Sequence, residues 1–172
     1  AQLMRNGVSL EKLHEVTMIT PYFLETIKKI VDFETVIKDN KSDIETLKEA
    51  KKIGFSDPFI AKLWGVPEIE IYNARKENNI FPVYKMVDTC HTNAYIPYFY
   101  SSYTGENSSR LTNKKKIIVL GAGPIRIGQG VEFDYSTVHA VMTIKNAGYE
   151  AIIINNNPET VSTDYDTADR LY

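Results

Sequence analysis

Apolar residues recur every third or fourth position through the first 80 residues, which is the spacing of amphipathic helices. Ser, Thr or Pro at the starts and Gly at the ends divide this pattern into separate helices. Ser42 with Glu45 three residues later has the form of a capping box. The chain therefore opens with a mainly α domain, whose expected helices cover residues 9–18, 20–37, 42–54, 56–65 and a stretch that begins at Pro67.

The pattern changes at residues 81–103, where Pro82 and Pro97 interrupt helix and aromatic residues gather. Two short extended segments are predicted, at residues 83–87 and 98–103. We expect the tyrosines here to pack against the helical domain, because no arginines alternate with them as in a base-stacking surface. Residues 104–115 have the composition of a linker. We therefore place a domain boundary near Asn113, between residues 1–113 and 114–172.

The last part of the chain has the pattern of a βαβ unit. After Lys116, an apolar and β-branched run to Leu120 is typical of a strand covered on both faces of a parallel sheet. Helical spacing follows from about Phe133 to the glycine at 148, and a second strand is predicted over residues 151–154. The fold class is thus a helical domain followed by an incomplete, Rossmann-like α/β unit. No third strand is apparent, so we expect a piece of a longer polypeptide.

A glycine-rich turn joins the first strand to this helix. It could seat an anion at the helix N-terminus or could simply close a tight turn. It departs from the dinucleotide fingerprint, because Arg126 stands at the sixth position and asparagines at 155–157 replace the ribose-binding acid. A Walker loop is also missing. The candidate anion seat comprises Gly121, Gly123, Arg126, Gly128, Gln129 and Gly130, and an NAD- or nucleotide-binding Rossmann protein stays an alternative.

Composition excludes several classes of protein. With 43% hydrophobic and 24% charged residues and a net charge of −2, the chain fits a soluble globular protein without a nucleic-acid footprint or a membrane span. The single cysteine, Cys90, excludes an intrachain disulfide and is expected to be a small buried apolar residue. His14, His91 and His139 are far apart in sequence, so no metal site is predicted, and His139 is expected to be a packing residue.

A rival interpretation concerns residues 59–71, whose small and apolar positions fit a helix-turn-helix. The would-be recognition helix, PEIEIYNARKENN, carries Glu68, Glu70 and Glu77 against Arg75 and Lys76. Acidic side chains there would face phosphates and oppose binding. A compact helix pair in an all-α domain needs the same residues, so DNA binding is kept only as an alternative.

Two carboxylates stand where α/β sheets hold their ligands. Glu132 follows the glycine turn and Glu159 follows the second strand, so both are predicted at the carboxyl edge of the parallel strands. They could be acids that interact with helix N-termini, or they could contact a ligand. No nucleophile with an adjacent base can be assembled from the local sequence.

Five segments of the chain together carry a resemblance to one known family. Two of them, LGAGPIRIGQGVEFDYSTVHA and NNPETVSTDYDTADRLY, are similar to the start of the second synthetase half, a pre-ATP-grasp unit, of the carbamoyl phosphate synthetase large subunit. Upstream, LHEVTMITPYFLETIKKIV, GFSDPFIAKLWG and FPVYKMVDTC resemble its helical oligomerisation domain, in the same order. The chain departs from the family's commonest sequence at Ile125, at Asn156 and at residues 91–93. None of these departures removes a charged group of the candidate site.

The resemblance implies a ligase that makes carbamoyl phosphate from bicarbonate, glutamine-derived ammonia and two ATP. ATP and Mg²⁺ would bind ATP-grasp domains outside this chain, which is then catalytically silent. Glu132 and Glu159 would line the internal passage for carbamate between the two active sites. The implied partners are a glutamine amidotransferase subunit or domain, the remainder of the large subunit and further copies of it. A cytoplasmic location is expected, with a mitochondrial address and the choice of arginine or pyrimidine synthesis left open.

Overall fold

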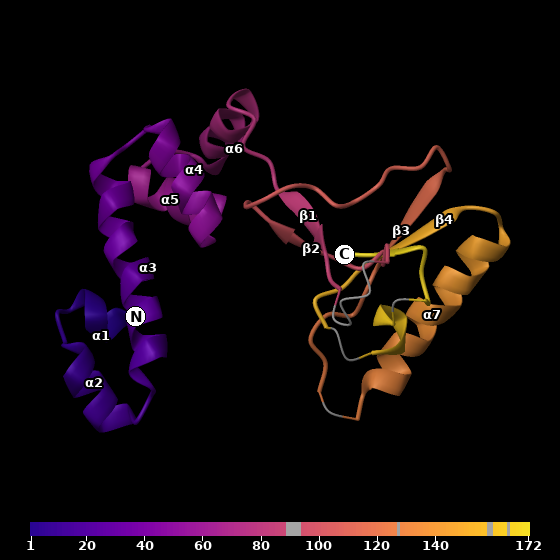
Figure 1. The fold of residues 1–172 in the computed structure, drawn as a ribbon, viewed down its shortest axis with the longest axis horizontal. Coiled ribbons are helices and arrows are strands. Elements are labelled where there is room, and N and C mark those ends of the chain that lie inside the picture. Colours follow the sequence, from indigo (N-terminus) through magenta and orange to yellow (C-terminus); the bar gives the residue numbers. More distant parts are fainter. Residues whose placement is uncertain (89–93, 127, 158–159, 165) are drawn as a thin grey trace. The chain divides into compact units, whose positions relative to one another are not determined.

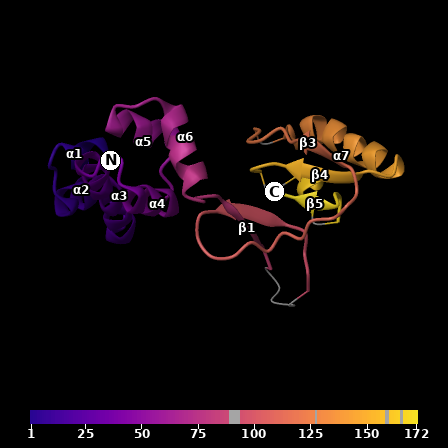
Figure 2. The ribbon, with the colours of Figure 1, turned by 90° about the horizontal axis from the view of Figure 1, so that it is seen from above.

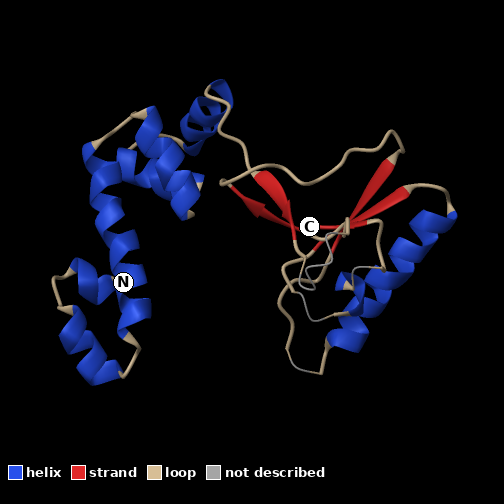
Figure 3. Ribbon diagram, in the orientation of Figure 1, coloured by secondary structure: helices blue, strands red, loops and turns tan. Residues whose placement is uncertain are grey.

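The computed structural model describes residues 1–88, 94–126, 128–157, 160–164 and 166–172. They form two compact units, Ala1–Phe81 and Pro82–Tyr172. All described strands belong to the second unit, and the first is built from helices (Figure 3). This division lies upstream of the sequence boundary near Asn113, because residues 82–112 make their contacts with the second unit.

The first unit contains six described helices: the five expected from the sequence, in the expected order, and the short α1, which was not predicted. The longest, α3, contacts α1, α2, α4 and α5 and is the central element of the unit (Figure 1). Ser9 and Ser56 accept hydrogen bonds from the backbone of the first turns of α2 and α5, which confirms both predicted caps. The helices are α1 (Gln2–Arg5), α2 (Leu10–Thr17), α3 (Pro21–Asp39), α4 (Ile44–Ile53), α5 (Asp57–Trp64) and α6 (Glu68–Glu77).

The predicted cap of α4 is wrong by one residue. Asp43, not Ser42, precedes the helix, and its carboxylate accepts a hydrogen bond from the Thr46 N–H at 2.7 Å. Ser42 has a left-handed backbone with φ of 62°, which places it in the turn before the helix. Glu45 lies in the first helical turn, where a negative charge is favourable.

Buried apolar side chains from all parts of the first unit form its interior. At one end of α3, Leu24 and Val31 pack with Met4 and Leu13. At the other end the interior includes Ile37, Leu47, Ile60, Trp64 and Ile71, all 5% exposed or less. The Trp64 indole N–H donates to the Ile37 carbonyl at 2.8 Å, so the only tryptophan of the chain is fixed in this core.

The second unit contains two small sheets. Strands β1 (Val83–Met86) and β2 (Phe99–Ser102) correspond to the two predicted extended segments. The structure pairs them antiparallel. Strand β3 (Lys116–Leu120), helix α7 (Gly130–Asn146) and strand β4 (Glu150–Ile154) form the predicted βαβ unit. Helix α7 lies along one face of the β3–β4 pair (Figure 2).

The expectation that no third strand follows is wrong. After the 3₁₀ helix η1 (Val161–Thr163), β5 (Arg170–Leu171) pairs parallel with β4, and the sheet order is β3-β4-β5. Two residues are too few for a periodic pattern to reveal. Leu171 packs with Val141, Ala151 and Ile153 in the core of this unit.

The prediction that β3 is covered on both faces is also wrong. It is an edge strand of this sheet, and Ile118 and Leu120 are 56% and 75% exposed. The helix begins at Gly130, earlier than about Phe133, and Gly148 has the expected left-handed backbone with φ of 83°. Among the apolar residues of this helix, Val141 is fully buried whereas Tyr135 and Met142 are exposed.

The aromatic segment packs on the second unit instead of the helical domain, which corrects the expectation for its tyrosines. The Phe99 ring, 1% exposed, stacks on Tyr172 with centroids 5.1 Å apart. The Tyr84 ring packs edge-on against the Tyr172 ring, with centroids 4.9 Å apart. In addition, the Leu171 N–H donates to the Pro97 carbonyl at 2.9 Å. The segment thereby covers β5 on the side opposite β4.

Candidate functional site

The carboxyl edge of the parallel sheet brings three segments together. The glycine turn leaves β3 there, α7 begins there, and residues 155–157 leave β4 there. This is the edge at which open parallel sheets bind ligands. It is therefore the candidate site, and its geometry begins with how the glycine turn is held.

Asn155 fastens the glycine turn. Its side-chain oxygen accepts hydrogen bonds from the Gly123 and Asn157 N–H groups, each at 3.2 Å. The Gly121 N–H donates to the Ile154 carbonyl at 2.9 Å. A Cβ at Gly121 would lie 2.5 Å from the Asn155 side chain, so only glycine fits beside this amide.

These contacts bear on the predicted anion seat. One N–H group of the turn that could face an anion, that of Gly123, instead donates a hydrogen bond to Asn155 Oδ1. Arg126 and Gly128 are exposed, and Gln129 precedes the first residue of α7, Gly130. The contacts at Gly121 and Gly123 fit the tight-turn interpretation there, and anion binding by the rest of the turn stays a prediction.

Of the two predicted carboxylates, the structure places Glu132. It lies in the first turn of α7 with an exposed side chain. Glu159 lies outside the described residues, as do Cys90 and His91. Two positions after Glu132, the Asp134 carboxylate points the other way: it is 7% exposed and accepts a hydrogen bond from the Ser162 N–H at 2.7 Å. That bond fixes η1 against the start of α7.

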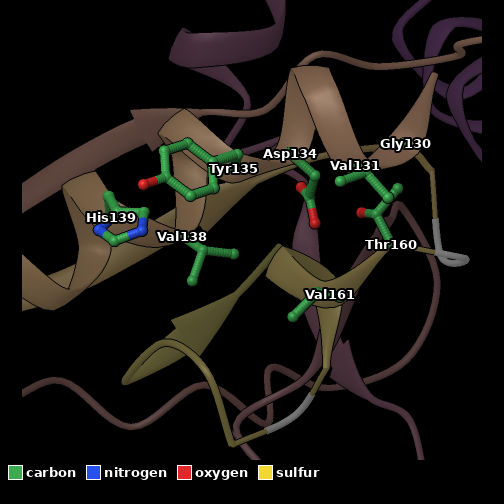
Figure 4. A pocket seen from close by; sticks show the side chains of 8 residues that line it. All are labelled: Gly130, Val131, Asp134, Tyr135, Val138, His139, Thr160 and Val161. Carbon is green, nitrogen blue, oxygen red and sulfur yellow. The ribbon is translucent and has the colours of Figure 1, made fainter.

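A pocket of about 370 Å³ lies between α7 and η1 (Figure 4). The Tyr135 and His139 rings, 4.2 Å apart, form one wall. His139 is exposed, so its prediction as a packing residue is wrong. The pocket is mainly apolar and is lined by Gly130, Val131, Asp134, Tyr135, Val138, His139, Thr160 and Val161.

The opposite, amino edge of the sheet holds an ion pair that sequence reasoning missed. Arg170 Nε lies 2.5 Å from Glu150 Oε1, and both side chains are about 5% exposed. Thr112 also donates to the Glu150 carboxylate, and Arg170 Nη1 donates to Ser109 Oγ at 3.1 Å. Burial opposes ionisation of Glu150, yet the hydrogen bond from Thr112 and the charge of Arg170 hold its pKa below the ordinary value.

The helix-turn-helix alternative requires a cationic recognition helix, and α6 does not offer one. Arg75, its would-be phosphate contact, donates from Nε and Nη2 to the Asp57 carboxylate at 2.9 and 2.5 Å. Glu68 and Glu70 occupy the first turn of α6. The guanidinium is therefore part of the interior packing between α5 and α6.

Two kinds of feature are missing from the described ranges of the chain. None of their helices is long and apolar enough to cross a membrane. Nor do they hold a group of three or more His, Cys, Asp or Glu side chains placed to ligate a metal ion. His14, for example, is paired through Nδ1 with the Ile19 carbonyl at 2.7 Å.

Two family models match the chain. One, described as the carbamoyl-phosphate synthetase large chain oligomerisation domain, covers residues 1–79, and the other, described as the carbamoyl phosphate synthase preATP-grasp domain, covers residues 113–172. Only residues 80–112 fall outside both matches. The matches give no support to the DNA-binding or NAD-binding alternatives. Because both are domains of the same large chain, in the order expected from the sequence motifs, the chain belongs to the carbamoyl phosphate synthetase large-chain family.

Proposed function

We propose that this chain acts within a glutamine-dependent carbamoyl phosphate synthetase and makes no carbamoyl phosphate by itself. The family is one of ligases, and the two matched domains are described as an oligomerisation domain and as a preATP-grasp domain. The first unit serves as a scaffold through which large subunits associate. The second begins the half of the enzyme that phosphorylates carbamate.

Glu132 and Glu159 line the route by which carbamate reaches that half. The observation that carries this proposal is the exposed Glu132 side chain in the first turn of α7, at the carboxyl edge of the sheet. Asn155 holds the glycine turn that leads to this helix, and Asp134, two residues after Glu132, holds η1 against the start of the helix. The proposal extends to Glu159 through its place in the sequence, two residues after Asn157.

A carboxylate suits such a route for a chemical reason. Carbamate has an NH₂ group that donates hydrogen bonds and a negative charge that a lysine or arginine would trap. Carboxylates accept those hydrogen bonds without binding the anion tightly. A passage that also excludes bulk water protects carbamate from decomposition.

ATP and Mg²⁺ belong to other domains of the enzyme in this proposal. The glycine turn is a poor fit to a nucleotide, since the Asn155 side chain occupies the space above Gly121 and takes up the Gly123 N–H. Ammonia comes from a glutamine amidotransferase subunit or domain. The remainder of the large subunit supplies the two ATP sites.

The decisive experiment replaces Glu132 with lysine in the complete synthetase. We expect carbamoyl phosphate synthesis from glutamine to fall at least about tenfold, since a cation at this position would hold carbamate. Two partial reactions that need no transfer, bicarbonate-dependent ATP hydrolysis and phosphorylation of ADP by carbamoyl phosphate, should keep their rates.

The matched control is Glu106→Lys, which makes the same charge change at an exposed position in the loop after β2. It should leave all three rates unchanged. An unaltered synthesis rate in Glu132→Lys would refute the proposal. Equal losses in all three reactions would refute it as well, because they would show a general structural defect.

A further inference from the structure

The carboxylate of Asp134 joins helix α7 to the 3₁₀ helix η1. Its side chain points from α7 toward η1 (Figure 4) and is only 7% exposed. Asp134 Oδ2 accepts a hydrogen bond from the Ser162 N–H at 2.7 Å, and Ser162 is itself fully buried. Moving a carboxylate out of water is unfavourable unless hydrogen bonds replace the lost hydration. This bond therefore ties the two elements together at a defined point.

The segment that Asp134 holds is also fixed by its own hydrogen bonds. Thr160 and Thr163 form a capping box around η1. The Thr160 N–H donates to Thr163 Oγ1 at 3.2 Å, and the Thr163 N–H donates to the Thr160 carbonyl at 3.0 Å. Because residues 160–163 form one hydrogen-bonded turn, a bond to Ser162 places the whole turn against α7.

This turn follows closely on the segment that leaves β4. The Asn157 N–H donates to Asn155 Oδ1 at 3.2 Å, so the chain is held again just after the strand. Only residues 158 and 159 separate Asn157 from Thr160 in the sequence. The segment that carries Glu159 is thus bounded on both sides by residues with hydrogen bonds that fix them.

We propose that Asp134 is a positioning residue for carbamate transfer, because it sets the segment that carries Glu159 against the helix that carries Glu132. This inference rests on the proposed function. A route that guides carbamate through hydrogen bonds needs its carboxylates at a fixed spacing, since hydrogen bonds weaken steeply with distance and angle. Without the Asp134 bond, carbamate escapes from the route before it is phosphorylated.

The number of ATP molecules hydrolysed per carbamoyl phosphate formed measures this escape in the complete synthetase. Carbamate that leaves the route reacts with water to give bicarbonate and ammonia, so the ATP used to form it yields no product. We expect Asp134→Ala to raise the ratio to at least about twice the wild-type value, because a displacement of about 1 Å at a reacting group can slow its step by up to about 100-fold. A purely destabilising change would lower synthesis and ATP hydrolysis in proportion and leave the ratio unaltered.

Three further variants separate the hydrogen bond from other effects. Asp134→Asn should keep the wild-type ratio, because an amide oxygen accepts the same N–H. Ser162→Pro removes the donor instead of the acceptor and should raise the ratio, which also keeps the test open if Asp134→Ala does not fold. The matched control is Asp169→Ala: Asp169 likewise accepts a backbone N–H from another element, that of Ala151 at 2.8 Å, but at the amino edge of the same sheet. Its ratio should stay at the wild-type value.

Several results would overturn the inference. A wild-type ratio in both Asp134→Ala and Ser162→Pro, with synthesis still impaired in Glu132→Lys, would refute the role of Asp134 and leave the proposed function intact. An equal rise in Asp169→Ala would refute it because any loosening of the second unit would then suffice. A raised ratio in Asp134→Asn would show that the charge matters and the hydrogen bond does not. Unaltered synthesis in Glu132→Lys would refute the proposed function and this inference with it.

Discussion

Asp57 is the residue whose loss should most destabilise the first unit. It lies at the start of α5 and is the common acceptor for two buried cations. Lys51 Nζ donates to one of its oxygens at 2.7 Å, and the Arg75 guanidinium donates twice to the other. The side chains of Lys51 and Arg75 are only 7% and 11% exposed. Asp57→Ala would therefore remove the carboxylate that both desolvated cations share.

The expected cost is about 3–5 kcal/mol of unfolding free energy, the range for removing one partner from a buried ion pair. A unit of the size of Ala1–Phe81 has a total stability of roughly 4–12 kcal/mol. The variant should thus lose a large part of its stability. Lys51 also donates to the Phe55 carbonyl at 2.7 Å and Arg75 to the Ile80 carbonyl at 3.2 Å, and both of these acceptors are uncharged.

Urea unfolding followed by Trp64 fluorescence measures this cost, because the single tryptophan is buried in the first unit. Glu49→Ala is the control: Glu49 accepts from Lys52 in an exposed pair, so the change should stay within about 0.5 kcal/mol. Adding Lys51→Met to Asp57→Ala should recover part of the loss by removing one stranded charge. A cost below about 1 kcal/mol for Asp57→Ala would refute the reasoning.

Two further predictions concern acid stability and the glycine turn. Hydrogen bonding by Arg5 lowers the pKa of Glu34, and the hydrogen bonds from Arg75 and Lys51 outweigh burial and lower that of Asp57. These carboxylates therefore stabilise the fold above their unfolded pKa values near 4, and the urea midpoint read from Trp64 should fall as the pH drops below about 4 but stay level between about 5 and 7. A midpoint unchanged at about pH 3 would contradict this assignment. In the second unit, Gly121→Ala places a Cβ 2.5 Å from Asn155, and we expect a loss of about 1–3 kcal/mol, measured by hydrogen exchange of the β4 amides. Asn155→Ser should make the same alanine less costly, and equal costs in both backgrounds would contradict the close-contact explanation.

Helix boundaries could be predicted because their signals are local. Ser9 and Ser56 cap helices, and Gly148 ends one, through bonds and dihedral angles set by a few neighbouring residues. Ser42 and Asp43 show the limit of such signals, since both side chains are good caps and the left-handed backbone at Ser42 decides between them. Local chemistry thus predicts that a helix begins, and the turn geometry selects the residue.

Burial was harder to predict, because it depends on which segments meet. The apolar run of β3 has the composition of a central strand, but β3 is an edge strand of this sheet. The Phe99 ring and its neighbouring tyrosines have no periodic pattern that names their partner, which is Tyr172, 73 positions after Phe99 in the sequence. The Glu150–Arg170 pair is similarly non-local, as it joins the first residues of two neighbouring strands.

The role of Asn155 is the part of the site that the sequence could have revealed. In a parallel pair that aligns Leu120 with Ile154, the next residues along each strand, Gly121 and Asn155, must lie side by side. A glycine on one strand then leaves room for the amide on the other, and that amide can accept the N–H groups of the turn. The Asn155 amide therefore explains the glycine at position 121 by close packing, and it holds the turn through the Gly123 N–H. At the same edge Glu132 is exposed in the first turn of α7, so the proposed role of this edge in carbamate transfer rests on that side chain.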